Sequence, residues 1–390
     1  MTGPPMVGNA GLRYALYFSA FFFVNGLMLA YWPVWLHDRG LDAAAIGTLL
    51  FAAQWIKVGG TLACGDIADR FAIARGLVVA LSLVGVAAMI LFGFASGFWP
   101  LLCLTLLWGV AWPSILPIVD GRAMQASVRG GFDYGRARLW GSITFIAATV
   151  GGGYLLQRSG SEAVYGAILA AAVVTAMAGL ILPASPRAQT APQALAPRGG
   201  AMVSLLRDPV FRTFMIAGGA LQVSHAVFYG FGTLDWRAKG LDDTAIGMLW
   251  ATGVVAEIVL FALGRRLAER VGVVRLLLVA GAAAVLRWTA TPFVVDFVPL
   301  LAVQALHALT FGATHLAAMM FIQRRVPAAA TSSAQALYAA LPIGLGMGLA
   351  MMAAGMLYER VAGLAYLAMI ALAGLSLLAT WMLAKRWRGE

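Results

Sequence analysis

Two ionisable residues, Lys57 and Glu257, lie in long apolar stretches of the chain and are 200 positions apart. An ionised side chain at such depth in an apolar helix is costly, so it marks a functional pathway by default. Their opposite charges would make a site electrostatically asymmetric, as an anionic ligand requires. The alternative is that both side chains reach toward the polar ends of their helices. We expect Lys57 to bind the anion and Glu257 to exchange a proton.

Three of the four histidines also lie in apolar stretches. His307 and His315 are eight residues apart and would share one helix face, separated by about 12 Å. His225 is equivalent to Asn25 in the repeat described below. A single histidine in such a place is more often a satisfied polar contact than a proton carrier, but three together indicate a polar core.

Arg138 is expected to have a partner, because an arginine buried without one would cost several kcal/mol. Arg138 and Asp120 both lie near helix ends and could instead extend to the surface. Trp112 could stack on an aromatic ligand, although core packing explains any single tryptophan more readily. The other candidates for substrate binding are Asn25, Arg138, His225, Tyr229 and His307. The other candidates for proton coupling are Asp120, Asp235, Arg287 and His315.

An internal repeat joins the two halves of the chain. Residues 40–50 read GLDAAAIGTLL and residues 240–250 read GLDDTAIGMLW, with seven identical positions. The same register continues without a gap for another 25 residues. In an apolar chain, such a parallel repeat predicts two membrane bundles related by a pseudo-two-fold axis along the membrane normal.

The composition requires a membrane protein, since 62% of the residues are hydrophobic and only 11% are charged. Runs of about 20 apolar residues can cross the bilayer as helices, and they lack the alternation of barrel strands. The sequence predicts an all-α protein with twelve such helices in two six-helix bundles. They span 12–36, 44–64, 76–95, 99–121, 138–157, 162–183, 211–235, 244–264, 273–291, 298–322, 333–356 and 363–384.

The net charge of +11 reflects membrane orientation rather than a nucleic-acid partner. With the N-terminus inside, 20 of the 27 Lys and Arg residues fall on the cytoplasmic side. This asymmetry places both termini in the cytoplasm of a bacterial-type inner membrane. The first apolar run lacks a cleavage site and is expected to remain as a helix.

The expected organisation is an N-terminal bundle (1–184), a cytoplasmic linker (185–209) and a C-terminal bundle (210–390). The linker begins with a flexible Pro- and Ala-rich stretch, and residues 203–212 are a candidate interfacial helix. The glycines of 344–348 indicate close packing or bending. No catalytic or nucleotide-binding motif is found, so we expect no enzyme activity, no cofactor and no metal site. We also expect the protein to be a monomer.

The segment from Gly65 through Asp69 and Arg70 resembles the helix 2–3 signature of the major facilitator superfamily. A cytoplasmic acid and arginine can pair with a neighbouring helix end in one conformation and release it in another. Glu269 and Arg270 repeat the motif in the second half. The resemblance implies a gating role for these five residues, whereas a solvated basic loop is the simpler interpretation.

Longer matches follow the whole chain. FDYGRARLWGS (132–142), with Asp120 upstream, resembles the lactose permease group, in which the corresponding acid and arginine form a charge pair beside the substrate. Glu257 and Arg287 match a further acid and arginine of that group in order and spacing. The closest resemblance is to the 3-phenylpropionate transporters, through HAVFYGFGTLDW (225–236), QALHALTFGATHLAAM (304–319) and AQALYAAL (334–341).

The resemblance to the 3-phenylpropionate transporters implies proton-driven uptake of a small aromatic monocarboxylate by alternating access. The implied partners are an organic anion, a proton and the lipid bilayer. The lactose permease match leaves a sugar or nucleoside symporter as an alternative, and an exporter of organic acids or drugs as another. The predicted helix 298–322 carries no acid, whereas the lactose permease group has its main proton-carrying Glu there. A proton would therefore use Glu257, Asp120, Asp235 or a histidine.

Overall fold

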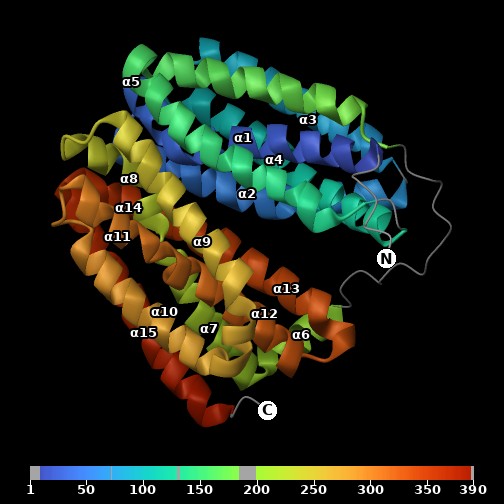
Figure 1. Cartoon of the computed structure of the whole chain (residues 1–390), viewed down its shortest axis with the longest axis vertical. Coiled ribbons are helices and arrows are strands. Elements are labelled where there is room, and N and C mark those ends of the chain that lie inside the picture. Colours follow the sequence, from blue (N-terminus) through green and yellow to red (C-terminus); the bar gives the residue numbers. More distant parts are fainter. Residues whose placement is uncertain (1–8, 72, 130–131, 184–198, 388–390) are drawn as a thin grey trace, which may run out of the picture. The chain divides into compact units, whose positions relative to one another are not determined.

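The computed structural model describes residues 9–71, 73–129, 132–183 and 199–387, and every regular element in these ranges is a helix (Figure 1). The first seven are α1 (Asn9–Asp38), α2 (Ala43–Arg70), α3 (Ala74–Phe94), α4 (Phe98–Val128), α5 (Tyr134–Leu180), α6 (Gly199–Arg207) and α7 (Pro209–Val223). Then follow α8 (Ala226–Ala238), α9 (Asp243–Val271), α10 (Val273–Ala290), α11 (Phe297–Ala305), η1 (Ala308–Ala313) and α12 (Thr314–Arg325). The last are η2 (Ala328–Ala330), α13 (Thr331–Tyr338), η3 (Ala339–Gly346), α14 (Met347–Val361), η4 (Ala362–Ala365) and α15 (Tyr366–Arg386).

Ten helical stretches in the described residues are long and apolar enough to cross a membrane. Two of them are unusually long, Tyr134–Leu180 with 47 residues and Ala328–Arg386 with 59. Gly160 has non-helical angles (φ 76°, ψ 179°) and divides the first of these. A positive φ of 47° at Ala362 and the η4 turn interrupt the second. Both long stretches therefore change direction within their length.

By its internal contacts the chain separates into two units. One comprises Met1–Leu41 and Ala52–Ala191, and the other comprises Asp42–Phe51 and Pro192–Glu390. In the first unit α1 packs along α5, and α3 packs on α4 and α5. In the second, α15 packs on α7 and α10, while α9 packs on η1 and α11.

The two copies of the repeated Gly-Leu-Asp sequence fold into the same turn. Gly40 and Gly240 both have φ +85°, a left-handed angle that glycine adopts without strain. The N–H groups of Gly40 and Leu41 donate to the carbonyls of His37 (2.8 Å) and Leu36 (3.2 Å), which closes α1 with a Schellman motif. The second copy makes the equivalent bonds, Gly240 to Arg237 (2.9 Å) and Leu241 to Trp236 (3.1 Å).

The aspartate that follows each glycine turn begins the next helix. Asp42 Oδ1 accepts the N–H of Ala45 at 2.7 Å, and Asp242 Oδ1 accepts that of Ala245 at 2.8 Å. These are N-cap bonds, which satisfy donors that the first helical turn leaves unpaired. The repeated residues thus specify the same stop and start signals 200 positions apart.

The predicted linker, 185–209, is described in the structure only from Gly199 onward. Residues 184–198 lie outside the described residues, but α6 already begins at Gly199. Asp208 then caps α7 through the N–H of Val210 at 2.9 Å, with Pro209 at the start of the helix. The expected interfacial helix over 203–212 is therefore wrong in its bounds, because Asp208 and Pro209 divide that segment between two helices.

The glycines of 344–348 lie in and just after the π-helical segment η3. Pro342 lies within this segment and has no N–H to donate to the preceding turn, which favours a local change of helix type. A Cβ on Gly346 would lie 3.3 Å from Leu341 O and from Val223 Cγ2. The segment thus combines bending with close packing.

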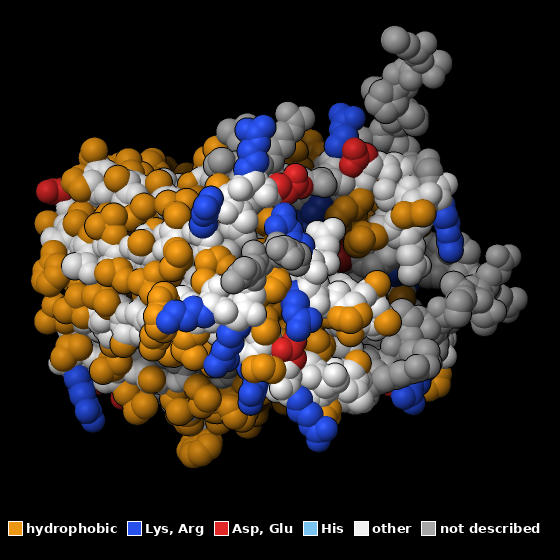
Figure 2. Space-filling model, turned by 90° about the horizontal axis from the view of Figure 1, so that it is seen from below, with side chains coloured by type: hydrophobic (Ala, Val, Ile, Leu, Met, Phe, Trp, Pro, Cys, Tyr) orange, Lys and Arg blue, Asp and Glu red, His pale blue; other side chains and the backbone are white. Residues whose placement is uncertain are grey.

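Large hydrophobic side chains are exposed over much of the surface, among them Phe94 (85%) and Trp99 (72%). Figure 2 shows a face whose left part is covered mostly by hydrophobic side chains. Most of the Lys and Arg side chains on this face lie in its middle and right parts. A soluble protein would not expose apolar patches on this scale, whereas a bilayer would cover them.

An aromatic stack fills the centre of the first unit. The Trp112 ring lies between Phe21, at 5.2 Å between ring centroids, and Trp108, at 4.6 Å. Trp112 is 2% exposed and lies against α3, where a Cβ on Gly85 would be only 2.9 Å from Trp112 Cε3. Trp112 therefore packs in the core of this unit.

We expect Gly85→Ala to destabilise the protein, by about 1–3 kcal/mol of overpacking, because the added methyl group displaces the Trp112 ring. Gly76→Ala on the same helix is the matched control, since its Cβ would meet nothing within 4 Å. The control should be neutral or slightly stabilising, as alanine favours a helix. Thermal unfolding in detergent measures both, and equal melting temperatures for the two variants would contradict the expectation.

Candidate functional site

A buried arginine organises a polar cluster in the second unit. Arg287 on α10 is 0% exposed. Its Nη1 donates to His307 Nδ1 at 3.1 Å and to Thr310 Oγ1 at 3.0 Å, and its Nη2 donates to Gln304 Oε1 at 2.8 Å. All three partners are neutral acceptors. The guanidinium is thus held by a fork of directed hydrogen bonds rather than by a carboxylate.

The bonds of Arg287 define the protonation state of His307. A guanidinium only donates, so Nδ1 of His307 must carry a lone pair and its ring proton must be on Nε2. That Nε2 lies 3.7 Å from Glu257 Oε2 on α9. His307 therefore stands between Arg287 and Glu257, and a second proton on it would break the Arg287 bond.

His225 is fixed in a neutral form by the same reasoning. Its Nδ1 lies 3.0 Å from Leu221 O and 3.2 Å from Gln222 O, and carbonyl oxygens only accept. The proton is then on Nδ1, and Nε2 accepts the hydroxyl hydrogen of Thr310 at 3.0 Å. Thr310 in turn accepts from Arg287, so every member of the cluster has one assigned direction.

Aromatic rings enclose the charged end of Arg287. Its Cζ lies 4.6 Å from the ring centroids of both Phe228 and Trp288. Such cation–π contacts stabilise a desolvated guanidinium by about 2 kcal/mol or more. Tyr229 stacks on His225 at 5.5 Å between centroids, which brings this predicted binding residue next to the cluster.

The chain around His307 is π-helical, over Ala308–Ala313. Phe311 stacks on His307 at 5.2 Å and on His315 at 6.4 Å, so the two histidines share a face but are separated by this ring. A Cβ on Gly312 would lie 2.8 Å from Leu260 Cδ2 and 3.5 Å from Glu257 Cγ. The glycine thus permits the close approach of α9 that brings Glu257 to His307. Single-turn π segments of this kind are frequent at functional sites.

In the first unit, the structure brings Asp120 and Arg138 together, with 3.9 Å between Arg138 Nε and Asp120 Oδ1. The hydrogen bond to this carboxylate comes from Tyr134 Oη at 2.9 Å. The Arg138 guanidinium lies over Phe22, with its Cζ 3.8 Å from the ring centroid. Both charged side chains are partly accessible, at 30% and 27%. The pair is therefore loose, and Tyr134 completes it.

Lys57 lies on α2, and its Nζ donates to Gln54 Oε1 at 2.9 Å. In the described part of the chain no acid forms an ion pair with it. Asn25, also predicted to bind, donates to Phe21 O at 2.7 Å within its own helix. Both side chains are half-buried, and each of these two hydrogen bonds joins residues three or four positions apart on the same helix.

Asp235 lies outside the Arg287 cluster. It is 2% exposed and forms an ion pair with Lys239, at 2.8 Å from Nζ to Oδ2. Lys239 also donates to Thr291 O at 2.7 Å. A Cβ on Gly363 would collide with Asp235 Oδ1, so only glycine fits against this carboxylate. These contacts join helix ends around the Asp235 carboxylate.

The predicted gating residues lie at helix ends. Arg70 at the end of α2 pairs with Asp66 at 2.8 Å, while the side chain of Asp69 lies outside the described residues. Gly65 has open space at its Cβ position. Glu269 and Arg270 occupy the corresponding end of α9.

The sequence did not single out Gln304, Thr310 and Tyr134. Gln304 and Thr310 each stand three residues from His307 in an apolar run, a spacing that shares one helix face. That polar stripe was the available signal. Tyr134 lies within the quoted 132–142 segment, but a tyrosine is equally common as a packing residue, so its type does not single it out there.

Long apolar helices that enclose a charged and hydrogen-bonded network are typical of membrane transporters. A family model described as the MFS_1 like family matches residues 12–368. The "Probable 3-phenylpropionic acid transporter" of Escherichia coli K12 is 31% identical over 358 residues, which cover 88% of this chain and 90% of the relative. The maltose permease of Geobacillus stearothermophilus is 27% identical over 96% of this chain and 95% of its own length.

Among solved structures, the nucleoside transporter NupG superposes with a TM-score of 0.81 at 17% identity, covering 97% of this chain and 98% of NupG. The POT family transporter PepTSo superposes with a TM-score of 0.70 at 12% identity over 98% of both chains. The fold is thus that of the major facilitator transporters. The chain belongs to the MFS_1 like family and is a multi-pass membrane transporter of the major facilitator superfamily.

Proposed function

We propose that this transporter imports a small aromatic monocarboxylate together with a proton. The observation that carries the proposal is the contact of Glu257 with His307, whose other ring nitrogen is occupied by Arg287. The two neutral histidines leave Glu257 as the titratable group of this cluster. The named 3-phenylpropionic acid relative supports an aromatic acid as substrate.

The proposed topology has twelve crossings in two six-helix bundles, 1–184 and 210–390, with both termini cytoplasmic. The stretches Tyr134–Leu180 and Ala328–Arg386 are each long enough for two crossings of about 30 Å. The break at Gly160 and the η4 turn would separate the crossings. The matching turns after α1 and α8 support the repeat, and the bias of Lys and Arg supports the orientation.

Lys57 is the proposed partner of the substrate carboxylate. An ammonium at this depth keeps its charge only where an anion or polar groups compensate it, and Gln54 is a neutral acceptor. The Asp120 carboxylate would compensate Arg138 instead.

We expect Lys57→Met to weaken binding of the acid about ten- to a hundredfold, since a charge-assisted bond contributes roughly 1.5–3 kcal/mol. An uncharged amide of the same acid should bind the variant nearly as well as the wild type. Lys57→Arg, which keeps the charge, is the matched control. Isothermal titration with 3-phenylpropionate and its amide measures the effect. Equal losses for acid and amide would make Lys57 structural.

A sugar or nucleoside symporter is the second candidate. The TM-score to NupG and the similarity to maltose permease favour it, together with the Asp120–Arg138 pair. An exporter of organic acids is a third. A thermal-shift screen of the purified protein against aromatic acids, sugars and nucleosides separates the substrate classes, because a ligand that binds the native state raises its apparent stability. Stabilisation by sugars or nucleosides alone would overturn the aromatic-acid proposal.

A further inference from the structure

Two grooves at equivalent positions of the repeat lie outside the cluster described above. The first, of about 510 Å³, is lined by Leu12, Arg13, Leu16, Arg75, Leu180, Ile181 and Leu182. The second, of about 270 Å³, is lined by Pro209, Arg212, Thr213, Ile216, Leu375, Leu378, Ala379, Met382 and Arg386. Positions 12, 13 and 16 of the first groove correspond to 212, 213 and 216 of the second, at the register of the repeat.

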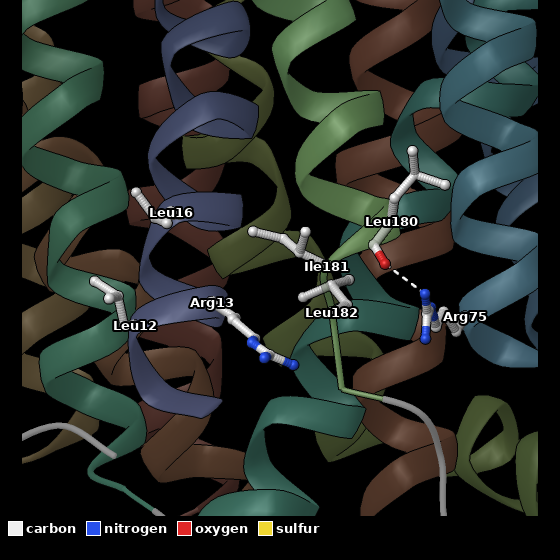
Figure 3. A pocket seen from close by; sticks show the side chains of 7 residues that line it. All are labelled: Leu12, Arg13, Leu16, Arg75, Leu180, Ile181 and Leu182. Carbon is white, nitrogen blue, oxygen red and sulfur yellow. Dashed lines mark hydrogen bonds between the residues drawn. The ribbon is translucent and has the colours of Figure 1, made fainter. Parts of the chain in front are cut away.

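Each groove combines two arginines with apolar walls. In the first, Arg13 of α1 and Arg75 of α3 flank the end of α5, where Arg75 donates to the carbonyl of Leu180 (Figure 3). A guanidinium has five N–H donors, so this bond orients Arg75 and leaves further donor groups. Leu16 and Ile181 form an exposed wall beside them, at 48% and 46%.

The second groove also holds two arginines, but at other repeat positions, because Arg13 corresponds to Thr213 and Arg212 to Leu12. Arg386 donates through Nη1 to Thr213 Oγ1 at 2.8 Å, which holds its side chain against the start of α7. Arg212 lies in the first turn of α7 and is exposed. Ile216 (48%) and Leu378 (55%) supply the exposed apolar wall. None of the described lining residues in either groove is acidic.

We propose that each groove binds an anionic phospholipid, with the phosphate between the two arginines and the acyl chains along the exposed leucine and isoleucine side chains. Paired guanidinium N–H groups match phosphate oxygens, and basic pockets between membrane helices bind anionic headgroups. A free phosphate would gain nothing from the apolar wall, which favours a lipid. The grooves are distinct from the transport residues, and on the proposed orientation they face the cytoplasmic leaflet.

The double variant Arg13→Gln/Arg212→Gln tests the proposal. Native mass spectrometry of the delipidated protein, titrated with phosphatidylglycerol or phosphatidylcholine, measures bound lipid. We expect the variant to bind phosphatidylglycerol at least about tenfold more weakly, with phosphatidylcholine binding unchanged. Arg324→Gln is the matched control, because Arg324 is exposed outside both grooves and its loss removes the same kind of charge. This control should bind like the wild type.

Three outcomes would overturn the proposal: unchanged phosphatidylglycerol binding in the double variant, an equal loss in Arg324→Gln, or competition by inorganic phosphate as effective as that by lipid. If the double variant does not fold, Arg13→Lys/Arg212→Lys carries the test. A lysine keeps the charge but not the paired donors. This variant should also lose preference for phosphatidylglycerol over phosphatidylcholine, and an unaltered preference would contradict the arginine fork.

Discussion

Replacing Arg287 with lysine is expected to lower both transport and thermal stability strongly. Lysine keeps the charge but cannot reach His307, Thr310 and Gln304 with one planar fork. Each buried acceptor left without a donor costs about 1–3 kcal/mol, so several kcal/mol of stability are at stake. We expect uptake into proteoliposomes to fall at least about tenfold. This corresponds to a loss of about 1.4 kcal/mol in the free energy that favours the transport-competent state.

Arg158→Lys is the control for this prediction, since Arg158 is exposed. Its Cζ lies 5.4 Å from the ring centroid of Tyr154. It should leave the melting temperature and uptake near their wild-type values. An Arg287→Lys protein with unchanged melting temperature would mean that the charge alone matters at this position. The fork geometry would then have no functional role.

The sequence predicted the elements that rest on local signals. The Gly-Leu-Asp turns are an example, because a left-handed glycine followed by a capping aspartate specifies a helix end and a helix start by itself. The Asp120–Arg138 pair was also predicted, from the resemblance to the lactose permease group together with the cost of an isolated charge. Tyr134, which supplies the hydrogen bond, was not, since a tyrosine is equally common as a packing residue.

The cluster around Arg287 could be predicted only in part. Arg287, His307, His225 and Glu257 were candidates by their charge or polarity, but their partners depend on how α9, α10 and η1 pack. Sequence spacing assigns faces on the assumption of regular helices, and the π segment Ala308–Ala313 alters that spacing locally. The directions of the hydrogen bonds, which make both histidines neutral, follow only from the three-dimensional contacts.

The neutral histidines bear directly on proton coupling. His307 cannot take a second proton while Arg287 donates to Nδ1, and His225 has its Nδ1 proton directed at carbonyls and its Nε2 occupied by Thr310. Asp235 is paired with Lys239. Glu257 Oε2 lies 3.7 Å from His307 Nε2, at the edge of this network. On the proposed function, Glu257 would gain and lose the proton without breaking these hydrogen bonds.

We therefore expect Glu257→Gln to abolish uphill accumulation driven by a pH gradient. Glutamine has nearly the same shape and can still contact His307, but it has no titratable proton. Binding of the substrate and exchange between internal and external substrate should persist within a few-fold of wild type. Proteoliposomes loaded with substrate for exchange, and others given an imposed pH gradient, measure the two activities in one preparation.

Glu162→Gln is the matched control, because Glu162 is 61% exposed and pairs with Arg39 at the surface. Such a pair contributes at most about 1 kcal/mol, so both activities should remain. If Glu257→Gln still accumulated substrate against its gradient, the proton would be carried elsewhere. Asp120 would be the next residue to replace, because it is partly accessible and its Tyr134 bond can rearrange when the carboxylate is protonated.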